Sequence, residues 1–264
     1  MRASVCKALK CHRERYMAKA ASHGRNFTVP TTVVGPCRKV PATTEPAVLR
    51  NSPMSKDEVF SLIAAGRRRA ADMFDQLNDE QLAVQSLCTA WTVHDMAGHL
   101  VAPFCVSMPR FALGSIFAGG FDKYSVKAAR KLGRRPIGEL TAVLRKNAES
   151  HFTPPGNGPM APLTDISVHT RDVARPLGLD VSAPLSTWKV VLTFLTSPTA
   201  SRGFVPKGRT SGLRVRATDQ DWSYGDGADI QGPSEALALA ILGRAAAFSD
   251  LSGEGVALLR GRLN

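Results

Sequence analysis

The pattern of hydrophobic and polar positions predicts a long helix at the start of the folded chain. Apolar residues recur every three or four positions over residues 59–77, which is the period of an amphipathic helix. Ser55 is followed three residues later by Glu58, and this capping-box spacing predicts that the helix begins there. The three arginines at 67–69 fall on the far side of this helix, so we expect them to be solvated.

Three further helices are predicted before residue 180. Thr92 and Asp95 form a second capping box in the run SLCTAWTVHDMAGHLVAPF, which predicts a helix start. Pro136 is placed to open another helix, because proline is favoured at the first helical position. The last of the three is predicted from about Leu163 to just before Pro176, which a helix cannot continue through.

The pattern changes after residue 180. A helical stretch over 188–195 leads into segment 197–212, which contains several glycine, proline and serine residues and is the expected boundary. The run GLRVRATD then alternates apolar and polar residues, which predicts a strand with one solvated face. WSYGDGADIQGP predicts a turn and a second short strand, and SEALALAILGRAAAF predicts an apolar helix that runs to about Phe248.

Charge separates a basic leader from the rest of the chain. The 264 residues have a net charge of +12, but residues 1–53 hold ten basic and two acidic groups, whereas residues 54–264 hold 24 and 20. The leader lacks the apolar stretch of a secretory signal. It is a disordered basic arm, a targeting peptide, or residues upstream of the natural start, and we favour the third interpretation because Met54 immediately precedes the first predicted helix. The near-balanced body does not favour a nucleic-acid partner.

The cysteines and the hydropathy of the chain indicate in which compartment the protein is expected. Cys6 and Cys11 lie close to His12, but no second ligand pair follows at zinc-finger spacing. Beyond the leader, the chain has Cys88 and Cys105 and no secretion signal, which indicates a reducing, cytoplasmic setting. No apolar run approaches the roughly 18 residues of a membrane-spanning helix, so no membrane partner is expected.

The candidate chemistry lies among the histidines, because the sequence has no phosphate loop, dinucleotide fingerprint or nucleophile elbow. His99 is flanked by apolar residues, so it projects from the apolar face of its helix. Asp165 and His169 are four residues apart and emerge from one helical face. Two imidazoles and a carboxylate from two helices can hold a divalent metal with an open position. The alternative is an exposed intrahelical pair and a packed core histidine.

Several other side chains have two interpretations. Arg244 lies in an otherwise apolar predicted helix, either as an active-site group or as a surface arginine with a buried stem. Asp172 is either a surface charge or a partner that orients a metal ligand. Cys88 is expected to be packing, and Trp91 is expected to wedge the start of its helix.

Three segments together carry a resemblance to a known family. The runs SLCTAWTVHDMAGHL, APLTDISVHTRDVARPLGL and ATDQDWSYGDGADIQGP occur in this order, and the chain from about residue 55 to 264 resembles the mycothiol-dependent maleylpyruvate isomerase family. The resemblance implies an α+β fold, in which a DinB-like four-helix bundle precedes a small α/β C-terminal domain similar to sterol-carrier-like modules. The implied domains are 54–180 for the bundle and 181–264 for a linker helix and the C-terminal domain.

The resemblance also implies the chemistry. It assigns a divalent metal, usually zinc, to His99, Asp165 and His169, although Asp165 stands where glutamate can occur. It assigns a part in activity to Arg244, which follows a glycine as in the family's C-terminal helix. The expected function is a metal-dependent isomerase or S-transferase that uses mycothiol or a similar thiol on an electrophilic small molecule. The alternative is a sensor or carrier that binds a metal or a small apolar ligand without catalysis.

Overall fold

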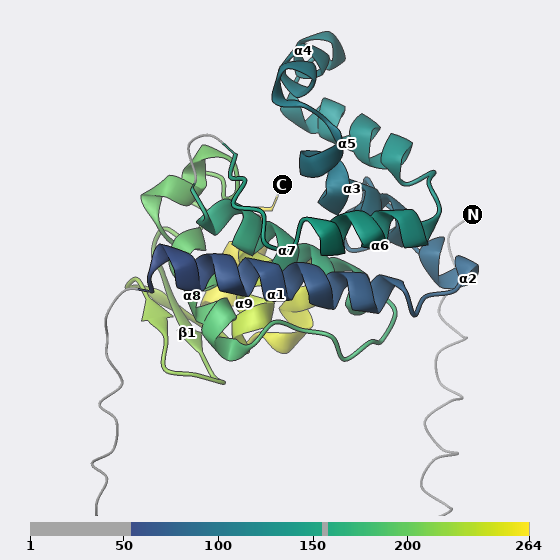
Figure 1. Ribbon diagram of the computed structural model, residues 1–264. Coiled ribbons are helices and arrows are strands. Elements are labelled where there is room, and N and C mark those ends of the chain that lie inside the picture. The colour runs from purple at the N-terminus through teal and green to yellow at the C-terminus, as the bar shows by residue number, and fades with distance from the viewer. Residues whose placement is uncertain (1–53, 155–157, 264) are drawn as a thin grey trace, which may run out of the picture. The chain divides into compact units, whose positions relative to one another are not determined.

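The computed structural model describes residues 54–154 and 158–263, so the expectations for the leader, residues 1–53, fall outside this description. The predicted fold class is confirmed, since a helical part is followed by a small sheet with its own helices (Figure 1). The helices of the first part are α1 (Lys56–Phe74), α2 (Asp79–Leu82), α3 (Val93–Cys105), α4 (Met108–Ala118), α5 (Phe121–Leu132), α6 (Ile137–Lys146) and α7 (Met160–Ala174).

Both predicted capping boxes are present. The Glu58 backbone N–H donates to Ser55 Oγ, and the Ser55 N–H donates back to the Glu58 carboxylate at 2.7 Å. Thr92 and Asp95 make the same reciprocal pair, each at 3.1 Å. Each box satisfies backbone donors that a helix start leaves without partners, so the starts of α1 and α3 are fixed locally.

Four of the helices form the bundle that holds the candidate site. Helix α1 packs against α6 and α7, and α3 packs against the same two helices from the other side. The close approach of α1 to α7 depends on Gly66, where an added Cβ would lie 3.1 Å from the Ile166 side chain. Helix α5 lies even closer to α3, since a Cβ on Gly98 would lie 2.3 Å from the Ala129 carbonyl oxygen.

The second part is built on a three-stranded sheet. Strand β1 (Leu213–Ala217) is central, antiparallel to β2 (Ser223–Tyr224) and parallel to β3 (Ala228–Gly232). The predicted alternation in β1 is confirmed, because its three apolar residues are buried and its two arginines are exposed. The run predicted as one strand after the turn forms two. The remaining elements are α8 (Leu185–Leu195), η1 (Pro198–Arg202), α9 (Ser234–Ile241), η2 (Ala245–Asp250) and α10 (Gly255–Gly261).

Two hydrophobic clusters fill this structure, and two helices contribute to both. The first half of α1 and part of α7 pack with α8, α9 and the sheet. The second half of α1 and other residues of α7 pack with α3, α5 and α6. The described helices and sheet therefore share their core across α1 and α7. The boundary expected in segment 197–212 and the domain limits implied at residue 180 both stay predictions.

The structure corrects the expectation for the arginine run in α1. Arg68 is exposed, but Arg67 is only 5% exposed. The Arg67 guanidinium donates to the carbonyl oxygens of Asn147, Ala148 and Ser150 at 2.8–3.0 Å. These carbonyls follow the C-terminal end of α6, where backbone acceptors lack helical partners. The prediction was wrong because the buried acceptors come from a distant segment.

Candidate metal centre

The three predicted metal ligands converge between α3 and α7. His99 Nε2 and Asp165 Oδ1 are 3.2 Å apart, and His169 Nε2 lies 3.3 Å from the same oxygen. The three ligand atoms all lie within 4.8 Å of one another. The imidazole rings are 4.7 Å apart at their centroids and nearly perpendicular, so both ring nitrogens approach one carboxylate from different directions.

Burial and charge decide the state of these side chains. The Asp165 side chain is 33% exposed, whereas those of His99 and His169 are 18% and 11% exposed. Burial alone would raise the pKa of Asp165, but the two neighbouring imidazoles lower it well below its usual value. Burial opposes protonation of His169, but Asp165 and then Asp172 raise its pKa well above the usual value. The carboxylate is therefore ionised and attracts cations.

The donor set and its spacing fit a divalent metal. Ligand atoms of a tetrahedral zinc site lie about 3.3–3.5 Å apart when the metal–ligand bonds are about 2.0–2.1 Å. The separations of 3.2 and 3.3 Å from the Asp165 oxygen to the two imidazole nitrogens are close to this range. Three protein ligands would leave a fourth position open. His99, Asp165 and His169 can therefore hold an ion without a large change in their positions.

The opposite edge of His169 is held by Asp172, one turn further along α7. His169 Nδ1 lies 2.9 Å from Asp172 Oδ2, and the Asp172 side chain is fully buried. An ionised carboxylate accepts a hydrogen bond, so Nδ1 keeps its proton, and Nε2 becomes the ligand atom when a metal displaces the proton that it carries in the metal-free protein. Of the two interpretations of Asp172, the structure favours the partner that orients a metal ligand.

Asp172 also joins this centre to Arg244. Arg244 Nε and NH2 donate to the two oxygens of Asp172 at 3.1 and 2.8 Å. Burial raises the pKa of Asp172, but hydrogen bonds from His169 and Arg244 outweigh it and lower that pKa overall. This two-bond geometry matches the planar fork of a guanidinium to a carboxylate. The buried carboxylate of Asp172 thus links Arg244 to His169, which in turn shares Asp165 with His99.

The position of Arg244 in the chain differs from the prediction. Helix α9 ends at Ile241, and Gly243 has φ of 88°, a left-handed conformation that a glycine adopts without strain. Arg244 then takes an extended conformation and precedes η2. The predicted helix to Phe248 was therefore wrong, because Gly243 turns the chain. This turn places the guanidinium beside α7.

Cys88 lies beside Asp172 at the Arg244 guanidinium. Arg244 NH2 is 3.3 Å from Cys88 Sγ, and the cysteine is half-buried. Cys88, His169 and Asp172 form a second group whose ligand atoms lie within 4.8 Å of one another. The interpretation of Cys88 as packing alone missed this contact. The amino-acid sequence gives no local signal for the contact between Cys88 and Arg244, because the two residues are 156 positions apart.

Trp91 forms an aromatic wall of the centre. Its ring stacks on His99 with centroids 4.3 Å apart and planes inclined by 25°, and its edge meets His169 at 5.8 Å. Trp91 is 8% exposed, and stacking restricts the orientation of the His99 ring. The nitrogens Trp91 Nε1 and His99 Nδ1 are buried without a hydrogen-bond partner among the described residues. Packing against Trp91 therefore positions the ring of His99, together with the Nε2 contact to Asp165.

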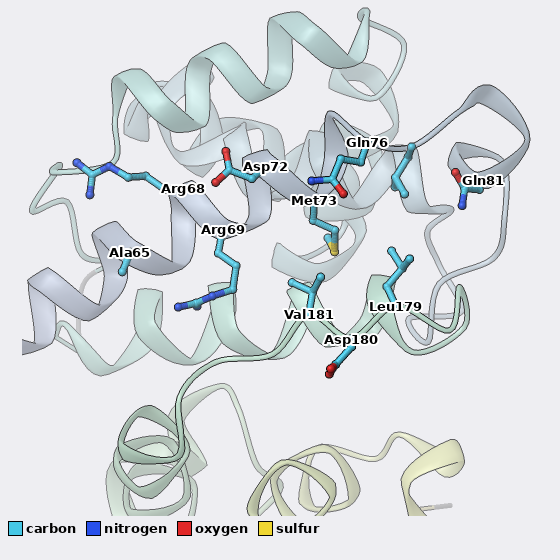
Figure 2. A pocket seen from close by; sticks show the side chains of 11 residues that line it. Ala65, Arg68, Arg69, Asp72, Met73, Gln76, Gln81, Leu179, Asp180 and Val181 are labelled. Carbon is cyan, nitrogen blue, oxygen red and sulfur yellow. The ribbon is translucent and has the colours of Figure 1, made fainter. Parts of the chain in front are cut away.

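A separate open hollow lies along α1 and contains none of these residues. Its volume is about 740 Å³, and Figure 2 shows Arg68, Arg69 and Asp72 of α1 above the segment with Asp180 and Val181. Two of these charged groups already have partners, since Arg68 pairs with Glu149 and Asp72 pairs with Arg145. The convergent polar chemistry of the described chain is therefore at the His99 centre and not in this hollow.

Comparisons with known proteins give a limited result. No protein-family model matches the chain. No curated protein matches it either. Two solved structures are similar, the mycothiol-dependent maleylpyruvate isomerase and a histidine-to-alanine mutant of the same enzyme. The mutant structure is 14% identical with a TM-score of 0.47, and the other is 15% identical with a TM-score of 0.44. Each match covers 76% of this chain and 93% of the other. These values are too low to transfer the function of those proteins to this chain.

Proposed function

We propose that this protein is a metal-dependent enzyme that uses a low-molecular-weight thiol, such as mycothiol, on an electrophilic small molecule. One observation carries the proposal: the ligand atoms of His99, Asp165 and His169 converge within 4.8 Å of one another. The nitrogen and oxygen donors suit zinc. The sequence motifs around these residues resemble those of the mycothiol-dependent maleylpyruvate isomerase family, which supports the choice of a thiol as the co-substrate.

The protein residues have separate parts in this chemistry. A divalent metal, when bound, supplies a positive charge that deprotonates a thiol. His99, Asp165 and His169 would hold this ion. Asp172 keeps the Nδ1 proton of His169 in place, which leaves Nε2 as the ligand atom. Trp91 covers one side of His99 and excludes water from it.

The reaction class follows from what a thiolate does to a conjugated acid. Addition of the sulfur to an activated double bond leaves a single bond, which can rotate, and expulsion of the sulfur after rotation gives the other isomer. An S-transferase would stop after the sulfur has attacked its electrophile. Both reactions build negative charge on carboxylate or enolate oxygens of the substrate. Arg244 is the cation that we assign to these oxygens. Because its Nε and NH2 groups already donate to Asp172, substrate binding would use its remaining N–H group or replace one of these bonds.

Metal content and thiol-dependent turnover test the proposal. Purified protein should hold about one divalent ion per chain, and His169→Ala should lose most of it. His94→Ala is the control, because His94 lies on α3 with the predicted ligand His99 but contacts the Arg135 carbonyl. Metal-loaded protein is then assayed with mycothiol or glutathione and a panel of electrophiles, including conjugated dicarboxylic acids.

Three outcomes are decisive. Turnover that requires both thiol and metal supports the enzyme. Equal metal content in the wild type and in a His99→Ala/His169→Ala double variant would contradict the metal centre. Stoichiometric metal without turnover on any electrophile would contradict catalysis and favour a metal-binding sensor or carrier.

A further inference from the structure

Helices α4 and α5 form a hairpin whose apolar side chains are unusually exposed. No residue of α4 is buried, and Figure 1 shows this helix at the outer end of the hairpin, away from α1 and α7. Contiguous exposed apolar residues on a folded protein mark an interaction surface. The large exposed ones here are Met108 (45%), Leu113 (56%), Ile116 (75%), Phe117 (82%) and Phe121 (64%). We call these five residues the apolar tip.

Most of the apolar tip is separate from the packing that holds the hairpin together, and only Phe121 of the five also contacts Phe111, with ring centroids 5.0 Å apart. Phe111 stacks edge-on against Tyr124 with centroids 5.0 Å apart, and Gly114 leaves room for the same tyrosine ring. Leu113, Ile116 and Phe117 are spaced three and four residues apart, so they share a different face of α4. These three exposed side chains are therefore not part of the packing between α4 and α5 in the described chain.

Basic residues are concentrated on the same hairpin as the apolar tip. Residues 107–135 hold seven basic side chains and one acidic one, a net charge of +6 in a body that is otherwise close to neutral. Four of the basic residues follow helical spacing along one face of α5. All seven are exposed, and they are Arg110, Lys123, Lys127, Arg130, Lys131, Arg134 and Arg135.

We propose that the α4–α5 hairpin docks on the surface of an anionic lipid bilayer. Large apolar side chains next to lysines and arginines are the composition of helices that lie in the membrane interface, with the apolar face among acyl chains and the cations at headgroups. In the described residues no helix has the length and apolar character needed to cross a bilayer, so the contact is peripheral. This proposal differs from the expectation of no membrane partner, because exposure of α4 is not visible in the sequence.

Charge and apolar exposure together favour an anionic bilayer over a second copy of the chain or a nucleic acid as the partner of this hairpin. A second copy of the chain would bring a surface of +6 against another of +6, and like charges at close range oppose association. A nucleic acid would use the cations but has no need of Phe117 and Ile116 at the tip. An anionic bilayer uses both kinds of side chain at once. The proposal does not depend on the chemistry at His99.

Vesicle binding of the full chain tests this proposal. We expect co-sedimentation with vesicles of phosphatidylcholine and phosphatidylglycerol, and much weaker binding to phosphatidylcholine alone. Ile116→Ser/Phe117→Ser should weaken binding by about tenfold or more, and Lys123→Gln/Lys127→Gln should do so by about tenfold. The matched controls are Leu185→Ser, at an exposed leucine on α8, and Lys146→Gln/Lys189→Gln, at two exposed lysines outside the hairpin.

A second measurement distinguishes insertion of the tip from adsorption through other basic segments. Phe117→Trp should be quenched by brominated acyl chains, whereas the three natural tryptophans, which are at most 8% exposed, should not be. Unchanged circular dichroism and melting temperature show that each variant folds. Equal binding of tip variants and controls would overturn the proposal, as would an absence of quenching. Loss of self-association in Ile116→Ser/Phe117→Ser, without any vesicle binding by the wild type, would assign the face to a second copy instead.

Discussion

His169 lies between two groups of ligand-type side chains, and the two groups differ in what neutralises them. On its Nε2 side, His99 and Asp165 bring one carboxylate and no permanent cation. On its Nδ1 side, Cys88 and Asp172 surround the Arg244 guanidinium. The second group therefore has a permanent cation in place, whereas the first has only imidazoles, which become neutral when they bind a metal. Two groups of metal-ligating side chains can thus be equally compact and still differ in their ability to bind a metal. The balance of charge within each group decides whether it can accept a metal ion.

The largest effect is expected when the carboxylate of the group that contains Cys88 and Asp172 is removed. Asp172→Ala leaves Arg244 buried without its counter-ion and His169 without its acceptor. We expect the free energy of unfolding of the metal-free protein to fall by about 3–5 kcal/mol, measured by urea denaturation. Asp165→Ala should cost less, because its side chain is partly exposed. If both substitutions cost the same, the two groups are not distinguished by their internal cation.

A second substitution keeps the cation and changes its geometry. Arg244→Lys retains the positive charge beside Asp172 but loses the two-bond fork. Metal content should stay at the wild-type level, while kcat/KM on a confirmed substrate should fall by roughly ten- to a thousandfold. Full turnover in this variant would show that Arg244 only neutralises Asp172 and does not bind substrate.

The smallest expected effect belongs to Cys88. Its sulfur accepts one hydrogen bond from Arg244 and it is half-buried, so Cys88→Ala should change the free energy of unfolding by only about 1 kcal/mol. Metal content should not change, because the ion is assigned to the other group. A loss of bound metal in Cys88→Ala, measured by elemental analysis, would move the metal to the Cys88 side of His169.

Local signals in the sequence were sufficient for the parts of the site that lie on regular helices. The capping box at Thr92 fixed the phase of the helix that carries His99, and the four-residue spacing placed Asp165 and His169 on one face. Their meeting with His99 required α3 and α7 to pack together, which the spacing alone left open. The structure brings them together as the metal hypothesis requires.

The features that the sequence did not predict depend on distant partners. Arg67 is buried because the end of α6 presents carbonyl oxygens to it, and Asp172 is buried because Arg244 reaches it from beyond the sheet. Gly243 within an apolar run was the one local sign that α9 ends before Arg244. The exposure of α4 has no local sign, since its apolar residues have the same helical spacing as those of a buried helix.

The sharing of α1 and α7 between two hydrophobic clusters has a consequence for how the molecule comes apart. Val59 and Ile63 of α1 pack with the sheet side, whereas Met73 and Phe74 of the same helix pack with α3 and α5. Loss of either cluster strips apolar cover from a helix that the other cluster needs. We therefore expect residues 54–263 to unfold cooperatively, in a single transition. The sequence predicts a helical bundle followed by a separate C-terminal domain, but the two parts would then unfold together as one thermodynamic unit.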